Sequence, residues 1–245
     1  MKLYGLTDIG LVRKNNQDSY AIRVLDDSLF IAVVCDGMGG AQAGNVASAV
    51  AVEAFSATLE DICKQGIPPD PELKRELLRG ACRAANTQVF ELAQNNSEYQ
   101  GMGTTLVAAL ALSHEIYVIN VGDSRCYILS EDQLRQITSD HSLVQALVDR
   151  GDITPEEART HPKKNVITRA LGVDDSIRSD VFCVEYKEGD VLLLCSDGLT
   201  NTVTDAVLQT ELSHLTSPEE TARKLLTLAV EQGAPDNVTV ILAQL

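Results

Sequence analysis

Three short apolar runs in this chain end in the same way, with an aspartate beside a glycine. Residues 29–35 lead into Asp36-Gly37, residues 116–121 into Gly122-Asp123, and residues 191–196 into Asp197-Gly198. Branched apolar side chains favour β-strands, and a carboxylate at a strand end is held by a rigid scaffold yet stays open to solvent. We therefore expect a fold in which these strand ends can share one cleft.

The other elements indicate an α+β fold. Further strand-like runs bring the set to residues 28–35, 104–112, 115–121, 125–129, 191–195 and 237–245. Apolar residues recur at helical spacing over residues 43–54 and 73–92, the second run following Asp70 as a capping residue. A late helix begins at Ser217 with a capping box. Because the helices come in blocks rather than alternating with strands, the pattern predicts one α+β domain over residues 1–245, with mainly antiparallel sheet.

A polar segment over about residues 139–172 separates two of the strand regions. It contains a second capping box, Thr154-Pro155-Glu156-Glu157. We expect this segment to form an excursion on the surface that carries short helices.

Composition and the N-terminus restrict partners and location. With 20 basic and 35 acidic residues the net charge is −15, and no run of Lys and Arg offers a basic patch for nucleic acid or an anionic membrane. The longest apolar runs, 29–35 and 106–112, are far shorter than the roughly 20 residues that span a bilayer. The chain reaches Asp8 before a secretion signal could form, which predicts a cytoplasmic protein. A monomer is the default.

The aspartates together indicate a cation site, although one Asp-Gly pair alone favours a tight turn. A fourth aspartate, Asp236, directly precedes the last strand. Carboxylate oxygens are the ligands of hard cations, so the set favours magnesium or manganese. Zinc is disfavoured because the histidines have no zinc-site spacing, and we predict surface or capping roles for most of these four residues: His114, His141, His161 and His214.

A polar stretch near the N-terminus supplies a possible phosphate ligand. Arg13 is followed by Lys14, Asn15, Asn16, Gln17 and Asp18. A polar surface loop explains this stretch equally well. The planar guanidinium of Arg13 suits two-point binding of phosphate oxygens, and beside cations it would complete a phosphate site.

Taken in order, these motifs resemble the protein phosphatase 2C family in its bacterial form, the metal-dependent serine/threonine phosphatases. The matching elements run almost from end to end: Arg13 with Asn16-Gln17-Asp18, Asp36-Gly37-Met38-Gly39-Gly40, Met102-Gly103-Thr104-Thr105, Gly122-Asp123-Ser124-Arg125, Ser196-Asp197-Gly198-Leu199 and Asp236-Asn237-Val238-Thr239. The resemblance implies a central sandwich of two antiparallel sheets with helices on both outer faces. It also implies two to three Mn²⁺ or Mg²⁺ ions, and phosphorylated proteins made by a serine/threonine kinase as substrates.

The resemblance also implies roles for single residues. Asp36 would bridge two metals and the Gly37 carbonyl would bind one of them. Asp197 and Asp236 would complete the pair, and Asp123 with Asp197 would hold a third ion. Asp18 would act through water or hydrogen bonds, and Arg13 would clamp the phosphate. Segment 139–172 lies where relatives carry a mobile flap, which we expect to influence substrate choice.

One departure concerns proton delivery. Many relatives carry a histidine just after the aspartate motif, where this chain has Ala41. The sequence therefore does not identify the group that protonates the departing Ser or Thr oxygen, and a water on the third ion is one candidate.

Two other functions are compatible with the sequence: an inactive regulatory module with the phosphatase fold, and a phosphoesterase for small molecules. A cysteine-based phosphatase is excluded because no cysteine has an arginine six positions away. A P-loop nucleotide hydrolase is excluded because the chain has no Gly-Lys pair.

Overall fold

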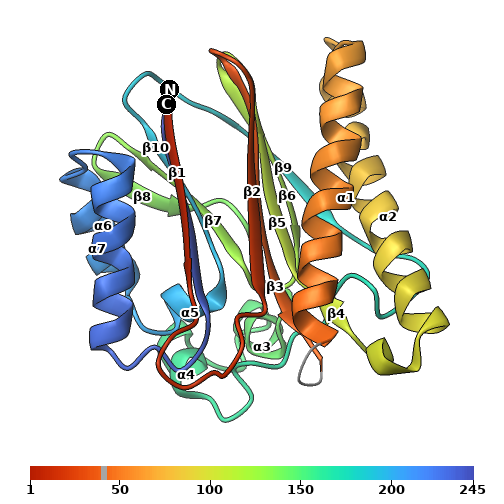
Figure 1. Cartoon of the computed structure of the whole chain (residues 1–245). Helices are drawn as coiled ribbons and strands as arrows, with labels where there is room; N and C mark the ends of the chain where they lie inside the picture. The colour runs from red at the N-terminus through yellow and green to blue at the C-terminus, as the bar shows by residue number, and fades with distance from the viewer. Residues whose placement is uncertain (40–42) are drawn as a thin grey trace.

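The computed structural model describes residues 1–39 and 43–245 and contains two antiparallel sheets packed face to face (Figure 1). In this part of the chain the first sheet is ordered β1 (Lys2–Asp8), β11 (Val238–Gln244), β10 (Val191–Cys195), β7 (Arg125–Ser130), β8 (Gln133–Gln136). The second is ordered β2 (Asp18–Asp26), β3 (Leu29–Met38), β5 (Leu106–Ala111), β6 (Glu115–Val121), β9 (Asp180–Glu185), and β4 (Gly103–Thr104) pairs with the end of β3.

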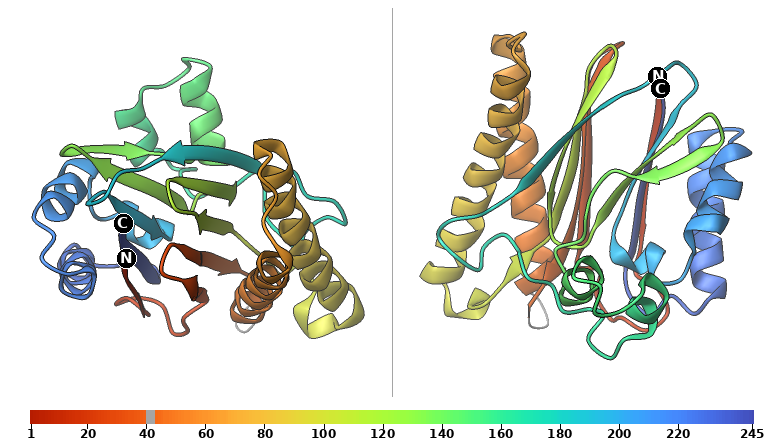
Figure 2. Two further views of the ribbon diagram at one scale, coloured as in Figure 1. Left: turned by 90° about the horizontal axis from the view of Figure 1, so that it is seen from above. Right: turned by 180° about the vertical axis from the view of Figure 1, so that it is seen from behind.

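Long helices cover the outer faces of both sheets (Figures 1 and 2). Helices α1 (Ala43–Gln65) and α2 (Pro71–Asn95) pack on the β2–β9 sheet, and α6 (Asp205–Ser213) and α7 (Pro218–Glu231) pack on the β1–β8 sheet. This arrangement confirms the predicted α+β sandwich.

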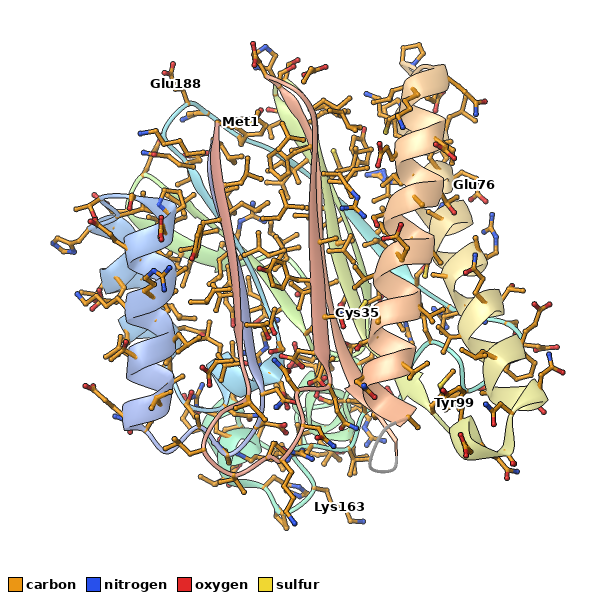
Figure 3. All side chains as sticks on the ribbon, viewed as in Figure 1. Met1, Cys35, Glu76, Tyr99, Lys163 and Glu188 are labelled. Atoms are coloured by element: carbon orange, nitrogen blue, oxygen red, sulfur yellow. The ribbon has the colours of Figure 1, made fainter. Side chains whose placement is uncertain are left out.

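Strand β3 shows why the apolar runs are continuous rather than alternating. Ile31, Val33 and Cys35 face the α1–α2 layer, whereas the next residues along the strand, such as Ala32 and Val34, belong to the core between the sheets. Successive side chains of a strand point to opposite faces, so a strand covered on both sides must be apolar throughout. Side chains fill the space between the sheets in Figure 3.

Capping residues start the helices where the sequence predicts. Asp70 accepts the N–H groups of Glu72 and Leu73 at 2.8 and 3.1 Å, at the start of α2. Ser217 accepts the Glu220 N–H at 3.2 Å, at the start of α7. These side chains satisfy N–H groups that have no partner within the helix.

Some elements were not predicted from the sequence, and others have different bounds. Strands β2, β8 and β9 were not predicted, because their side chains are largely half-buried or exposed and the apolar signal is weak. The predicted strand 104–112 is interrupted at Thr105, between β4 and β5. Both long helices extend beyond their apolar repeats, to Gln65 and Asn95.

Segment 139–172 contains two short helices, α3 (Leu143–Asp149) and α4 (Pro155–Thr160). Thr154 and Glu157 form the predicted capping box: Thr154 Oγ1 accepts the Glu157 N–H at 3.2 Å and Glu157 Oε2 accepts the Thr154 N–H at 2.7 Å. The other short helices are α5 (Asp197–Thr200) and the 3₁₀ turn η1 (Ser97–Tyr99). Over the described residues, no helix is both long and apolar enough to cross a bilayer.

Candidate metal centre

Asp18 and Asp36 are brought together by the pairing of β2 with β3, in which they are directly opposite each other. The main chain of Asp36 is held on both sides. Its N–H donates to Thr105 Oγ1 at 2.8 Å, and its carbonyl accepts the Thr104 hydroxyl and the Thr105 N–H, each at 2.9 Å. The interruption between β4 and β5 thus provides the groups that fix the end of β3.

Asp18 joins the two sheets through its side chain. Its Oδ2 accepts the hydroxyls of Ser196 at 2.7 Å and Thr239 at 2.6 Å, and both come from the opposite sheet or the turn after it. Its Oδ1 is buried without a hydrogen-bond partner. Burial raises the pKa of Asp18 to about 6, against the opposing effect of the two hydroxyls. A buried oxygen with free lone pairs is costly unless a donor or cation meets it.

Asp197 is the first residue of α5, directly after β10. Asn201 donates to its Oδ2 at 2.8 Å, whereas Oδ1 is a second buried oxygen without a partner. Burial, then repulsion from Asp236, raises the pKa of Asp197. The next residue is Gly198, and a Cβ at this position would lie 1.9 Å from the Asn237 carbonyl oxygen. The close approach of these two segments requires a glycine at this position.

Asp123 follows the turn after β6. Gly122 has a φ of +105°, which only glycine adopts without strain, and the turn exposes just 9% of Asp123. Burial, followed by repulsion from Asp197 and Asp140, raises the pKa of Asp123 to about 8.

Asp236 and Arg13 form an ion pair of 2.6 Å at the rim of the site. The side chain of Arg13 is 50% exposed and that of Asp236 is 22% exposed. The loop that carries Arg13 is fixed by Asn237, whose Nδ2 donates to the carbonyls of Ile9 at 2.9 Å and Asn15 at 3.1 Å. Arg13 is therefore presented to solvent from a fixed main chain.

Gly37 lies where β3 and the start of α1 meet. Its N–H donates to the Gln17 carbonyl at 3.0 Å, and a Cβ on Gly37 would lie 2.0 Å from the Gly44 carbonyl oxygen. No larger residue fits there. Ala41, the position of the missing histidine, lies outside the described residues.

The electrostatics of the cluster fit a hard cation. Burial, then repulsion from Asp18, Asp197, Asp123 and Asp236, holds the pKa of Asp36 well above its usual range. Carboxylates that destabilise each other's charge, together with two unpartnered oxygens, form an oxygen-only donor set of the kind that Mg²⁺ and Mn²⁺ prefer.

The carboxylates are not arranged as a complete set of metal ligands. Within residues 1–39 and 43–245, no three His, Cys, Asp or Glu side chains converge as a ready-made metal site, and one oxygen of Asp236 is engaged by Arg13. Binding would therefore require the carboxylates to move inward and Asp236 to give up its ion pair. Rotating a side chain costs little, whereas a buried oxygen without a hydrogen-bond partner is costly. The two unpartnered oxygens therefore still favour a cation site here.

The structure thus brings all the predicted site residues to one end of the sandwich, and the metal-binding roles of single residues stay predictions. No role was predicted for Ser196, Thr239 and Asn237, although each belongs to one of the motifs described above. Surface or capping roles were predicted for most of the four histidines, and His141 is an exception, since it is 7% exposed and hydrogen-bonded within the protein.

A groove of about 500 Å³ opens from the aspartates. Asp123 and Asp197 lie in it, segment 139–172 supplies one wall, and α5 with the start of α6 supplies another. Figure 3 places Lys163, in segment 139–172, at the end of the molecule opposite Met1 and Glu188. The site therefore has a neighbouring space large enough for several residues of a bound chain.

Comparison with known proteins identifies the family. The family model described as Protein phosphatase 2C matches residues 12–232. The serine/threonine phosphatase stp of Listeria welshimeri is 40% identical, over 97% of this chain and 93% of that protein. The crystal structure of the serine/threonine phosphatase Stp1 from Staphylococcus aureus is 39% identical with a TM-score of 0.89, covering 99% of this chain and 94% of that one. The chain belongs to the protein phosphatase 2C family.

A second similar structure bears on the metal. The catalytic domain of the serine/threonine protein phosphatase PstP, in complex with two manganese ions, is 39% identical with a TM-score of 0.82, covering 99% of this chain and 97% of that one. In that protein, manganese is bound by a domain of closely similar fold.

Proposed function

We propose that this chain removes phosphate from phosphoserine and phosphothreonine in proteins, using two to three Mg²⁺ or Mn²⁺ ions. Membership of the family makes it a metal-dependent serine/threonine phosphatase rather than an inactive module. The observation that carries the proposal for this site is the buried cluster of aspartates with two unpartnered oxygens, beside an exposed arginine.

The residues divide the work between ion binding and substrate binding. Asp36, the Gly37 carbonyl, Asp197 and Asp236 would hold a pair of ions, and Asp123 with Asp197 a third. When bound, the ions supply Lewis acidity and lower the pKa of water, so that hydroxide forms near neutral pH.

Three further features of the chain support the reaction. Asp18 positions its neighbours, because its Oδ2 accepts the hydroxyls of Ser196 and Thr239, two residues that are also hydrogen-bonded to each other. The guanidinium of Arg13 donates to the phosphoryl oxygens, exchanging its partner Asp236 for the substrate. Ala41 has no ionisable side chain, so the proton for the departing oxygen must come from another group.

The wider assignments follow from the same proposal. Residues 1–245 act as one catalytic domain, and segment 139–172 acts as a flap that contacts the substrate across the groove. The substrates are proteins that a cytoplasmic kinase has phosphorylated on serine or threonine. The acidic surface argues against nucleic acid and membrane partners, and we take the chain to act as a monomer.

A peptide assay tests the proposal. A phosphothreonine peptide is incubated with the protein and Mn²⁺, Mg²⁺ or a chelator, and released phosphate is measured for wild type and Asp197→Asn. We expect turnover only with metal, and a loss of roughly 100-fold or more in the variant. Metal-independent turnover, or full activity of the variant, contradicts the two-metal mechanism. Faster hydrolysis of free phosphometabolites than of the peptide would instead favour a small-molecule phosphoesterase.

A further inference from the structure

His141 occupies a position that the reaction itself does not use. It lies at the start of segment 139–172, is 7% exposed, and clasps Gly122 from both sides. Its N–H donates to the Gly122 carbonyl at 2.9 Å, and its ring Nδ1 accepts the Gly122 N–H at 3.1 Å. Gly122 directly precedes Asp123, so this clasp holds the turn that presents Asp123.

The clasp defines the protonation of the ring. Since Nδ1 accepts a hydrogen bond, the proton of the neutral ring is on Nε2, which donates to Asp180 Oδ2 at 3.1 Å. Arg169 Nη1 donates to Asp180 Oδ1 at 3.1 Å and also lies 3.0 Å from His141 Nε2, so this edge of the ring faces both the Asp180 carboxylate and the Arg169 guanidinium. Burial lowers the pKa of His141, which favours the neutral ring.

His141 also fastens the far end of segment 139–172. Its carbonyl accepts the Thr168 N–H at 2.7 Å, one residue before Arg169. Next to it, Leu143 N–H donates to the Val166 carbonyl at 2.8 Å. Both ends of the segment therefore meet at His141.

The turn itself has little freedom to adjust. A Cβ on Gly122 would lie 2.6 Å from Thr105 Cγ2, and Thr105 is the residue that holds the main chain of Asp36. Asn120 Nδ2 spans the same region, donating to the carbonyls of Gly122 at 3.2 Å and Ser139 at 3.1 Å. A shift of the turn would be passed directly to Asp123.

We infer that His141 is a positioning residue that ties the Gly122-Asp123 turn to both ends of segment 139–172 and so sets the affinity of the cation site that includes Asp123. The inference rests on the proposed role of Asp123. It adds that the position of the flap and the position of Asp123 are coupled through the ring of the buried His141. Groups that orient metal ligands typically change metal affinity by 10–100-fold when they are removed.

Two substitutions separate the two contacts of the ring. In His141→Asn the amide oxygen replaces Nδ1 as the acceptor for Gly122 N–H, but the contact with Asp180 is lost. In His141→Gln the longer amide reaches toward Asp180, but the acceptor for Gly122 N–H is lost. Mn²⁺ alone is titrated into metal-free protein by calorimetry, which measures each site without relying on activity.

We expect His141→Gln to weaken the Asp123-dependent site by roughly tenfold or more and to leave the paired sites unchanged, with His141→Asn close to wild type. Asp123→Ala should abolish the same site, and adding His141→Gln to it should change nothing further. The inference is overturned if His141→Gln leaves that site unchanged, weakens all sites in parallel, or matches His141→Asn.

Two controls keep the outcome clear. If Asp123→Ala leaves Mn²⁺ binding intact, the proposed role of Asp123 is wrong and the inference falls with it; if Asp123→Ala removes the site but His141→Gln does not weaken it, only the inference falls. Should His141→Gln fail to fold, Asp180→Ala takes its place, because the Asp180 side chain is 38% exposed and its loss leaves the imidazole Nε2–H without the acceptor that orients the ring. The short amide of His141→Asn does not reach that acceptor and is oriented by Gly122 alone, so the two variants differ. A weaker Asp123-dependent site, of about threefold or more, is then expected; unchanged binding overturns the inference.

Discussion

The strand ends that carry the aspartates and segment 139–172 lie at the same end of the molecule but are held in different ways (Figure 1). Strand β3 is bonded to β2 on one side and to β5 on the other, and its residues from Phe30 to Cys35 are fully buried. In the segment, α3 buries only Val144 and α4 buries none of its residues.

This difference separates two requirements of a phosphatase. Metal ligands must keep their relative positions, and a strand between two others provides that. A surface segment with few buried contacts opens locally at low cost, as the proposed contact of segment 139–172 with protein substrates requires. His141 is where the two regions join, so substitutions on either side of it test how independent they are.

The largest effect is expected at the rigid side. Asp36→Asn should lower peptide turnover by roughly 100- to 1,000-fold, because the neutral amide removes a charge at the centre of the cluster. The metal-free variant should unfold at a higher temperature than wild type, since Asp36 is repelled by its neighbours. Retained activity together with an unchanged unfolding temperature would show that the cluster is not the catalytic centre.

The inner core should respond through stability. Leu194 is fully buried between the sheets, on β10 just before the turn to Asp197. Leu194→Ala should lower the free energy of unfolding by about 2–5 kcal/mol, measured by denaturant titration. Leu11→Ala, at a side chain that is 64% exposed, is a control that should change stability by less than about 0.5 kcal/mol. Equal losses in both variants would contradict the assigned core.

The aspartates should make the stability of metal-free protein depend on pH. Asp18 has a pKa of about 6 and Asp123 a pKa of about 8, both raised by burial. Because the folded state holds these protons more tightly than the unfolded state, the contribution of these two groups to stability should be largest near pH 4 and should fall as the pH rises to about 8. For Asp18 alone the loss is at most about 3 kcal/mol.

The measurement is the unfolding temperature between pH 4 and 9 with a chelator present. Asp123→Asn should remove the part of the fall that lies nearest pH 8, and saturating Mn²⁺ should flatten or reverse the curve. Stability that rises steadily through this range in metal-free protein would argue against a buried, mutually repelling cluster.

The smallest effect is expected in segment 139–172. Thr154→Ala removes the side-chain bond of the capping box, in which Thr154 Oγ1 accepts the Glu157 N–H, and leaves the bond from the Thr154 N–H to Glu157 in place. Loss of such a cap costs the helix about 1 kcal/mol. Since α4 buries none of its residues, this cost should appear as faster amide exchange within the helix, with little change in global unfolding. A large drop in global stability would show that the segment is packed as firmly as the sheets.

Much of the architecture was predictable because the signals are local. The apolar runs of residues 29–35 and 191–195 identified buried strands, and helical periodicity identified α1, α2 and α7. Strand β2 was not predicted, because only Asp18 and Ala21 among its residues are buried. Without an apolar pattern, its pairing with β3 could not be foreseen, nor could the position of Asp18 opposite Asp36.

The sequence by itself determined which carboxylates stand at strand ends, since periodicity and the residue that follows each strand are properties of neighbouring positions. Only the tertiary structure decided what those carboxylates experience. Asp18 meets the Ser196 hydroxyl across 178 positions of the chain, and His141 meets Asp180 across 39. Such contacts depend on the register of distant strands, and the same packing that buries the groups creates the raised pKa values and unpartnered oxygens of the site.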